Sequence, residues 1–170
     1  MKPQIKVGIG YDSHRFVLER PLVLGGVIIP HLCGLEGHSD ADVLLHSIAD
    51  ALLGAAGLGD IGTHFPDTDD KYKDIKSTKL LALVFEKIIK AGFIIGNVDS
   101  VIIAEVPKMN RHIPVMRSKI AKILVTDEQN ISIKATTNER MGFIGREEGI
   151  AVMATALIYK DDGTFSSTDK

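Results

Sequence analysis

Imidazole and carboxylate side chains are concentrated near the amino terminus, where five of the six histidines lie within the first 64 residues. Asp12 and His14 follow an apolar segment at a spacing of two, which places both side chains on one face if the segment continues as a strand. Asp42, His46 and Asp50 recur at intervals of four, which places them on one stripe of a helix. One carboxylate and two imidazoles that leave a fourth position open are typical of a catalytic zinc site.

This pattern predicts a zinc ion, or another divalent transition metal, bound by Asp12, His14 and His46. Asp42 or Asp50 would then orient one of the imidazoles. The alternative needs no metal: Asp42 completes a helix cap, and His46 is a half-buried histidine with hydrogen-bond partners of its own. Because Asp-x-His is a short pattern with many accidental matches, the spacing leaves both interpretations open.

A second group of polar residues lies in a segment without helical or strand periodicity. Residues 60–69 (DIGTHFPDTD) combine three acids and a histidine with Gly and Pro, which suits the wall or lid of a pocket for a polar or sugar-like ligand. Turn chemistry explains the same composition, because Asp and Thr side chains bond their own backbone. Both interpretations stay open for this loop.

Residues 134–146 (KATTNERMGFIGR) bring Thr136, Thr137, Glu139 and Arg146 together beside two glycines. Hydroxyl, backbone N–H and guanidinium groups at a strand end suit phosphate oxygens, and a lone carboxylate among phosphates suits Mg²⁺. The alternative is an ordinary glycine-rich hairpin with solvated charges.

Several common site types are absent from the sequence. It contains no GxxxxGK[ST] phosphate loop, no GxGxxG dinucleotide turn and no GxSxG nucleophile motif. Cys33 is the only cysteine, which excludes an internal disulfide and a cysteine-rich zinc module and fits a reducing compartment.

Apolar periodicity and turn residues predict the elements that must position these groups. Strands are expected at 5–9, 98–106, 131–137 and 150–159, with an apolar hairpin at 21–30 that turns at Gly25 and Gly26. Helices are expected from a capping-box-like start at Ser39 and Asp42 to Gly57, from a cap at Ser77 to Gly92, and over 111–124. Residues 58–76 are expected to form a long loop.

This order of elements predicts an α+β fold, a two-layer sandwich of helices on a mixed β-sheet. The strand–helix–strand unit from 98 to 137 is expected to be a parallel crossover. Residues 1–160 are expected to form a single domain, and the polar residues 161–170 a disordered tail.

The composition is that of an ordinary globular domain, with 45% hydrophobic and 25% charged residues among 170. A net charge of -2 and the absence of Trp argue against nucleic acid or a membrane surface as the partner. No apolar run has the length of a signal peptide or a membrane span. A cytoplasmic location is expected, or the plastid stroma if a transit peptide has been removed.

Five long blocks of the sequence resemble the 2-C-methyl-D-erythritol 2,4-cyclodiphosphate synthase family of the non-mevalonate isoprenoid pathway. The resemblance covers residues 6–157 and rests on GIGYDSHRF, GLEGHSDADVLLHSIADALLGAAGLGDIG, HFPDTD, NVDSVIIAEVPKM and IKATTNERMGFIGREEGIA. Blocks of this length in this order are far more specific than any single motif above.

The resemblance implies a homotrimer with active sites between adjacent subunits, zinc on Asp12, His14 and His46, and Mg²⁺ or Mn²⁺ on Glu139 between the substrate phosphates. It assigns transition-state stabilisation to His38 and Thr137. The family's substrate-contacting positions fall on Asp12, Ser13, His14, His38 and Ser39; on Asp60, Ile61, Gly62, Phe65, Pro66, Asp67, Thr68 and Asp69 at the sugar; on Ala104, Glu105, Val106, Pro107, Lys108 and Met109 at the cytidine; and on Thr136, Thr137, Asn138, Glu139, Phe143 and Arg146 at the phosphates.

The reaction that the resemblance implies is that of a phosphorus–oxygen lyase. In it, 4-diphosphocytidyl-2-C-methyl-D-erythritol 2-phosphate closes to 2-C-methyl-D-erythritol 2,4-cyclodiphosphate and releases CMP. Two other functions are compatible with the same residues. A zinc-dependent hydrolase would share the three metal ligands but would not need a nucleotide pocket. A non-enzymatic trimer would bind a ligand, such as an isoprenoid diphosphate in a cavity on its threefold axis near Arg146.

Overall fold

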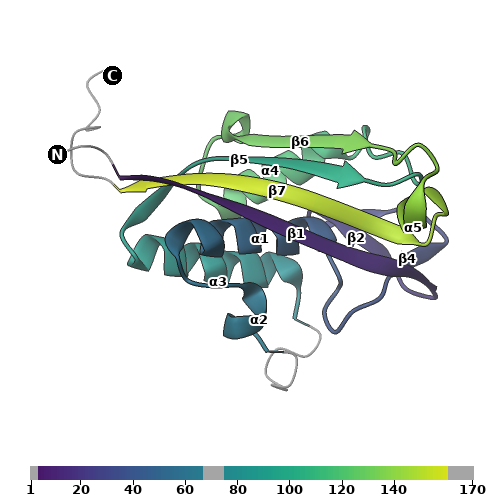
Figure 1. Cartoon of the computed structure of the whole chain (residues 1–170), viewed down its shortest axis with the longest axis horizontal. Coiled ribbons are helices and arrows are strands. Elements are labelled where there is room, and N and C mark those ends of the chain that lie inside the picture. The colour runs from purple at the N-terminus through teal and green to yellow at the C-terminus, as the bar shows by residue number, and fades with distance from the viewer. Residues whose placement is uncertain (1–3, 67–74, 161–170) are drawn as a thin grey trace.

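A mixed five-stranded sheet forms one layer of the computed structural model, which describes residues 4–66 and 75–160 (Figure 1). In spatial order its strands are β4 (Cys33–Leu35), β1 (Ile5–Leu18), β7 (Gly149–Lys160), β5 (Phe93–Ile103) and β6 (Ile131–Thr136). The pair β5 and β6 is parallel and the other neighbours are antiparallel. The predicted mixed sheet and parallel crossover are therefore confirmed.

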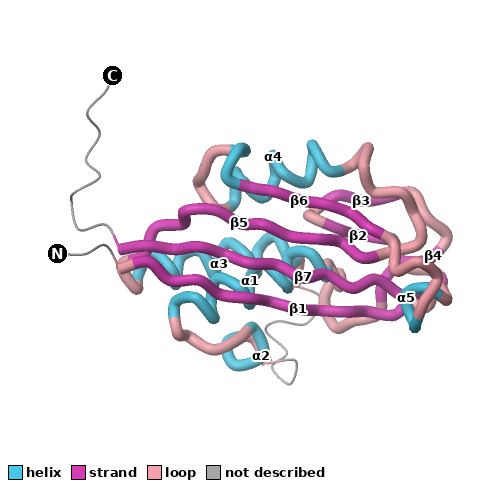
Figure 2. Tube along the Cα trace, turned by 45° about the horizontal axis from the view of Figure 1, so that its top comes forward, coloured by secondary structure: helices cyan, strands magenta, loops and turns pink. Residues whose placement is uncertain are grey.

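Helices form the second layer, on one face of the sheet (Figure 2). The long ones are α1 (Val43–Ala56), α3 (Ser77–Lys90) and α4 (Ile113–Ile123), and α4 connects the two parallel strands. Helix α1 packs on β1 and β7 with one side and on α3 with another, and so it is buried almost all round. None of the helices in the described part of the chain is long and apolar enough to cross a membrane.

Smaller elements surround this core. They are the hairpin of β2 (Leu22–Leu24) and β3 (Val27–Ile29), the short helices α2 (Ile61–His64) and α5 (Gly142–Gly145), and a 3-10 helix, η2 (Glu128–Asn130). The hairpin confirms the predicted turn, since Gly25 and Gly26 both have positive φ angles. The tail that was expected at 161–170 lies outside the described residues.

Several predicted boundaries and caps were wrong. Strand β1 continues to Leu18 because its polar half pairs with residues 149–154 of β7 and then with β4. The elements β4, α2 and α5 were not foreseen. Asp42, rather than Ser39, caps α1, with its carboxylate accepting the Leu45 N–H at 3.1 Å. Ser77 is the first residue of α3 and not its cap. Strand β5 begins at Phe93, ahead of the predicted start, because the segment from Phe93 pairs with the end of β7.

Two glycines allow β1 to lie directly against α1. A Cβ atom on Gly10 would lie 2.0 Å from the Ser47 carbonyl oxygen, and one on Gly8 would lie 2.0 Å from that of Ala51. Because the obstructing atoms belong to helix backbone, no side-chain rotation relieves the clash. This close approach keeps the strand and the helix in the register that the site below requires.

We expect Gly10→Ala to lower the free energy of unfolding by about 3 kcal/mol, the upper end for overpacked cores, in urea titrations. Gly54→Ala is the matched control, because the Cβ added there in α1 meets nothing closer than Ile9 O at 3.9 Å. It should be neutral or stabilise by up to about 1 kcal/mol, since Gly disfavours helix interiors. Equal urea midpoints for Gly10→Ala and wild type would contradict the close approach.

Candidate metal centre and adjoining cavities

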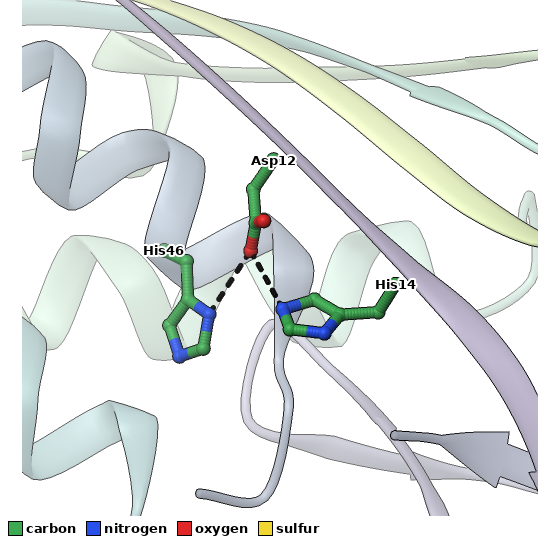
Figure 3. Close-up of side chains that lie close together, drawn as sticks. All are labelled: Asp12, His14 and His46. Atoms are coloured by element: carbon green, nitrogen blue, oxygen red, sulfur yellow. Dashed lines mark hydrogen bonds and ion pairs between the residues drawn. The ribbon is translucent and has the colours of Figure 1, made fainter. Parts of the chain in front are cut away.

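Three side chains from β1 and α1 converge on one point (Figure 3). Asp12 and His14 alternate along β1 on the face toward α1, and His46 projects from the first turns of that helix. The Oδ2 atom of Asp12 lies 2.9 Å from His14 Nε2 and 3.0 Å from His46 Nδ1. The ligand atoms of the three residues lie within 4.8 Å of one another, so this group could hold a metal ion.

The hydrogen bonds around His14 and Asp12 prepare these atoms to act as ligands. His14 Nδ1 lies 2.6 Å from the Glu36 carbonyl oxygen, which can only accept, so in the neutral ring Nδ1 carries the proton and Nε2 keeps its lone pair. The Ser13 N–H donates to Asp12 Oδ1 at 2.8 Å and leaves Oδ2 to face the imidazoles. Two imidazole nitrogens and one carboxylate oxygen are a donor set that fits Zn²⁺ or a similar cation.

The neighbouring Asp12 and His14 side chains shift each other's pKa. Partial burial of Asp12 opposes ionisation, but its hydrogen bonds to His14 and His46 outweigh this effect and lower its pKa below the ordinary value. Burial lowers the pKa of His14, but the Asp12 carboxylate accepts a hydrogen bond from the ring when it is protonated, so the net shift is upward. The Asp12 carboxylate therefore stays ionised and offers its negative charge to a bound cation.

The expectation that Asp42 or Asp50 orients an imidazole is wrong. Asp42 is fully buried and accepts the N–H groups of Gly25 at 2.9 Å, Gly26 at 2.7 Å and Leu45, so it joins the β2–β3 hairpin to α1. Burial raises the pKa of Asp42 to about 6, although these N–H bonds oppose the shift. Asp50 accepts the Ile61 N–H at 2.8 Å. The alternative in which Asp42 completes the helix cap is confirmed.

The group that contacts the far side of His46 was missed from the sequence. His46 Nε2 lies 2.9 Å from Ser77 Oγ and 3.3 Å from Ser39 Oγ. The only sequence signal was a serine before an amphipathic helix, and that signal predicts a cap rather than a partner for a histidine 31 residues away.

A cavity of about 270 Å³ opens beside the three ligands. Five other predicted site residues line it: His38, Ser39, Ile61, Gly62 and Phe65. Asp60 caps α2 through the Thr63 N–H at 2.8 Å, and Pro66 ends this part of the described chain. The predicted positions Asp67, Thr68 and Asp69 lie outside the described residues. Ser13 alternates to the opposite face of β1 from the metal centre and, with His14 and Phe143, lines another hollow.

A second cavity, of about 180 Å³, lies where β5 and β6 end. Six predicted site residues line it: Ala104, Pro107, Lys108, Met109, Thr136 and Thr137. The Val106–Pro107 peptide bond in its wall is cis. Two segments 30 residues apart are brought together here because β5 and β6 are parallel neighbours whose carboxyl ends meet at one edge.

The loop after β6 is held by Glu105. Its Oε1 atom accepts the backbone N–H groups of Asn138 and Arg140, both at 3.0 Å. Within the loop, Thr137 Oγ1 donates to Glu139 Oε1 at 3.2 Å. Arg146 follows α5, and its guanidinium donates to Glu148 at 2.6 Å, which leaves both side chains at the surface.

The structure does not bring the two cavities together within one chain. One row of paired residues crosses the sheet from β1 to β6. Ser13 of β1 pairs with Ala151 of β7, Ala151 pairs with Ile103 of β5, and Ile103 pairs with Thr136 of β6. Three strand spacings separate the β1 end of this row from the β6 end by about 14 Å. The metal centre and the β5–β6 cavity are therefore distinct sites in the isolated chain.

Comparisons with known proteins agree over almost the whole chain. The sequence profile of the YgbB family matches residues 5–159. A protein of Halalkalibacterium halodurans named 2-C-methyl-D-erythritol 2,4-cyclodiphosphate synthase is 56% identical over 156 residues, 92% of this chain and 99% of that protein. The synthase of Desulfitobacterium hafniense is 54% identical over the same shares.

Solved structures show the same fold. The bifunctional IspDF from Campylobacter jejuni superposes with a TM-score of 0.92 at 47% identity, over 96% of this chain and 44% of that longer chain. The Plasmodium falciparum IspF in complex with CDP superposes with a TM-score of 0.82 at 37% identity, over 93% of this chain and 97% of that one.

Proposed function

Since this chain belongs to the YgbB family, whose matching relatives are named 2-C-methyl-D-erythritol 2,4-cyclodiphosphate synthases, we propose that it catalyses the same cyclisation. Its substrate is 4-diphosphocytidyl-2-C-methyl-D-erythritol 2-phosphate, and its products are 2-C-methyl-D-erythritol 2,4-cyclodiphosphate and CMP. The observation that carries the proposal is the convergence of Asp12 Oδ2, His14 Nε2 and His46 Nδ1 at the mouth of a cavity, which suits a metal-bound phosphate.

The reaction is an intramolecular phosphoryl transfer. An oxygen of the 2-phosphate forms a bond to the β-phosphorus, the bond from that phosphorus to the bridging oxygen breaks, and its electron pair leaves on CMP. A phosphate oxygen is already ionised at neutral pH, so no side chain has to act as a base. Catalysis then depends on positioning and charge neutralisation.

The residues divide this task between the two cavities. Asp12, His14 and His46 would hold zinc, and Glu139 would hold Mg²⁺ or Mn²⁺. Bound there, these ions would supply Lewis-acid polarisation of the β-phosphate and neutralise charge on the leaving phosphate. His38 and Ser39 contact the phosphates from the first cavity, and the residues of the second cavity bind cytidine and orient the diphosphate. His38 and Thr137 stabilise the transition state.

The direct test is ³¹P NMR of the purified chain with that substrate, zinc and magnesium. Two coupled cyclic-diphosphate resonances with stoichiometric CMP are expected. Linear phosphate products would instead show that the protein is a zinc-dependent hydrolase. A metal-loaded protein that binds the substrate without changing its spectrum would leave only a binding role.

We also propose that the chain works as a homotrimer in the cytoplasm. The sheet face opposite the helices exposes large apolar side chains along β1 and β7: Ile5 58%, Val7 67%, Ile9 63%, Tyr11 53% and Met153 41%. Contiguous apolar surface of this kind is typical of a protein interface. Assembly through this face would pair the metal centre of one subunit with the nucleotide cavity of the next. The reducing cytoplasm suits the free Cys33.

We expect Ile9→Glu to convert the trimer to monomers in light scattering, because it places a charge in the middle of the apolar face. The monomer should keep its helical circular dichroism, since Ile9 is 63% exposed in the isolated chain. Ile28→Glu is the matched comparison, because it makes the same change at an isoleucine that is 71% exposed on the β2–β3 hairpin, outside the apolar face. A trimer that persists in Ile9→Glu would place the interface elsewhere.

A further inference from the structure

We propose that Ser77 and Asp40 are positioning residues that fix the tautomer of His46 and thereby set the affinity of the metal centre. The inference rests on the metal site of the proposed function and adds to it two residues outside the ligand set. Neither residue lies in the Asp-x-His pair or on the His46 stripe of α1, so neither was singled out as part of the site from the sequence.

The contacts form an unbroken chain from the ligand to a carboxylate. His46 Nε2 lies 2.9 Å from Ser77 Oγ, and Ser77 Oγ donates to Asp40 Oδ1 at 2.5 Å. The Ser77 backbone N–H also points to the carboxylate, at 3.2 Å from Oδ1 and 3.1 Å from Oδ2. Ser77 is fully buried and His46 is 7% exposed, so water does not compete freely for these bonds.

The direction of each bond follows from the number of protons available. A hydroxyl has one hydrogen, and that of Ser77 is directed to Asp40, whose carboxylate can only accept. Toward His46 the hydroxyl can therefore only accept, so Nε2 must carry the imidazole proton. In neutral imidazole a protonated Nε2 leaves the lone pair on Nδ1, the atom that faces Asp12 Oδ2.

The place of these hydrogen bonds in the fold makes the arrangement of His46, Ser77 and Asp40 rigid. Ser77 is the first residue of α3, and the Asp40 carboxylate lies at the amino-terminal end of that helix, where the helix dipole favours a negative charge. Asp40 thus joins the loop before α1 to the start of α3. His14 has the equivalent support from the Glu36 carbonyl, so each imidazole is oriented by an acceptor on its far side.

Zinc affinity measured by competition with a chromophoric chelator at one neutral pH tests the proposal without using activity. Outer hydrogen-bond partners of metal ligands are typically worth about 10- to 100-fold in affinity. Ser77→Ala should weaken zinc binding by at least about tenfold, with Ser39 Oγ, 3.3 Å from His46 Nε2, giving partial compensation. Asp40→Asn keeps an acceptor oxygen for the Ser77 hydroxyl and should have a smaller effect.

Two further variants separate orientation of His46 from general damage to the fold. Ser47→Ala removes a buried hydroxyl next to His46, whose single hydrogen is shared between Val43 O at 2.9 Å and Val152 O at 3.1 Å, and it should leave zinc affinity unchanged. Ser77→Thr crowds the same buried position but keeps the hydroxyl. It should lower the thermal transition more than Ser77→Ala does and still bind zinc like wild type.

The wild-type titration comes first, because a chain that binds no zinc would overturn the metal site of the proposed function itself. If wild type binds zinc and Ser77→Ala binds it equally well, the role of Ser77 and Asp40 is wrong while the metal site stands. Loss of affinity in Ser77→Thr equal to that in Ser77→Ala would also contradict the proposal, since steric damage would then explain both.

Discussion

Asp12→Asn is expected to abolish zinc binding and, with it, the cyclisation. One oxygen, Asp12 Oδ2, faces both imidazoles, and the amide of Asn offers either an N–H₂ group or a neutral carbonyl in its place. The loss of a direct ligand should exceed the roughly 100-fold that outer partners are worth in affinity. Turnover in the ³¹P assay should fall on the order of a thousand-fold, since Lewis-acid stabilisation supplies several kcal/mol.

The matched control for this variant is Asp127→Asn, which makes the same chemical change beside η2, where the Asp127 side chain makes no capping hydrogen bond. Asp127→Asn should bind zinc and turn over like wild type. The trimer should persist in both variants, because Asp12 faces α1 and not the apolar sheet face. Unchanged turnover in Asp12→Asn would refute the assignment of the metal centre.

Asp42→Ala is expected to lower the free energy of unfolding by about 3 kcal/mol, measured by urea titration of the zinc-free chain. The variant loses the cap of α1, worth about 1 kcal/mol, and leaves the N–H groups of Gly25 and Gly26 without their acceptor, at about 1 to 3 kcal/mol each. Removing the buried carboxylate also removes its desolvation cost, which offsets part of this loss in stability. A loss of this size is a large fraction of the stability of a domain.

Asp60→Ala removes another helix cap and serves as the comparison. Asp60 lies at the surface and caps only the four-residue helix α2. Its loss should cost no more than about 1 kcal/mol. If the two variants have the same urea midpoint, Asp42 acts as a simple cap and does not hold the β2–β3 hairpin.

The sequence by itself predicted the three candidate ligands and determined the layers that carry them. Period-two spacing places Asp12 and His14 on one face of a strand, and an Ala- and Leu-rich pattern places His46 in a helix that must be buried. These are properties of local geometry, so they can be read from a few neighbouring residues. The long blocks shared with a known family also predicted an activity, because they cover nearly the whole chain.

Only the tertiary structure decided what the other polar residues near the centre do. Asp42 and Asp50 share the helical stripe of His46, yet their carboxylates bond backbone N–H groups of the hairpin and of α2. Ser77 instead supports His46 from another helix, with Asp40 behind it. Local spacing cannot choose among nearby carboxylates and hydroxyls, because each bonds whichever group the packing of distant segments places within about 3 Å.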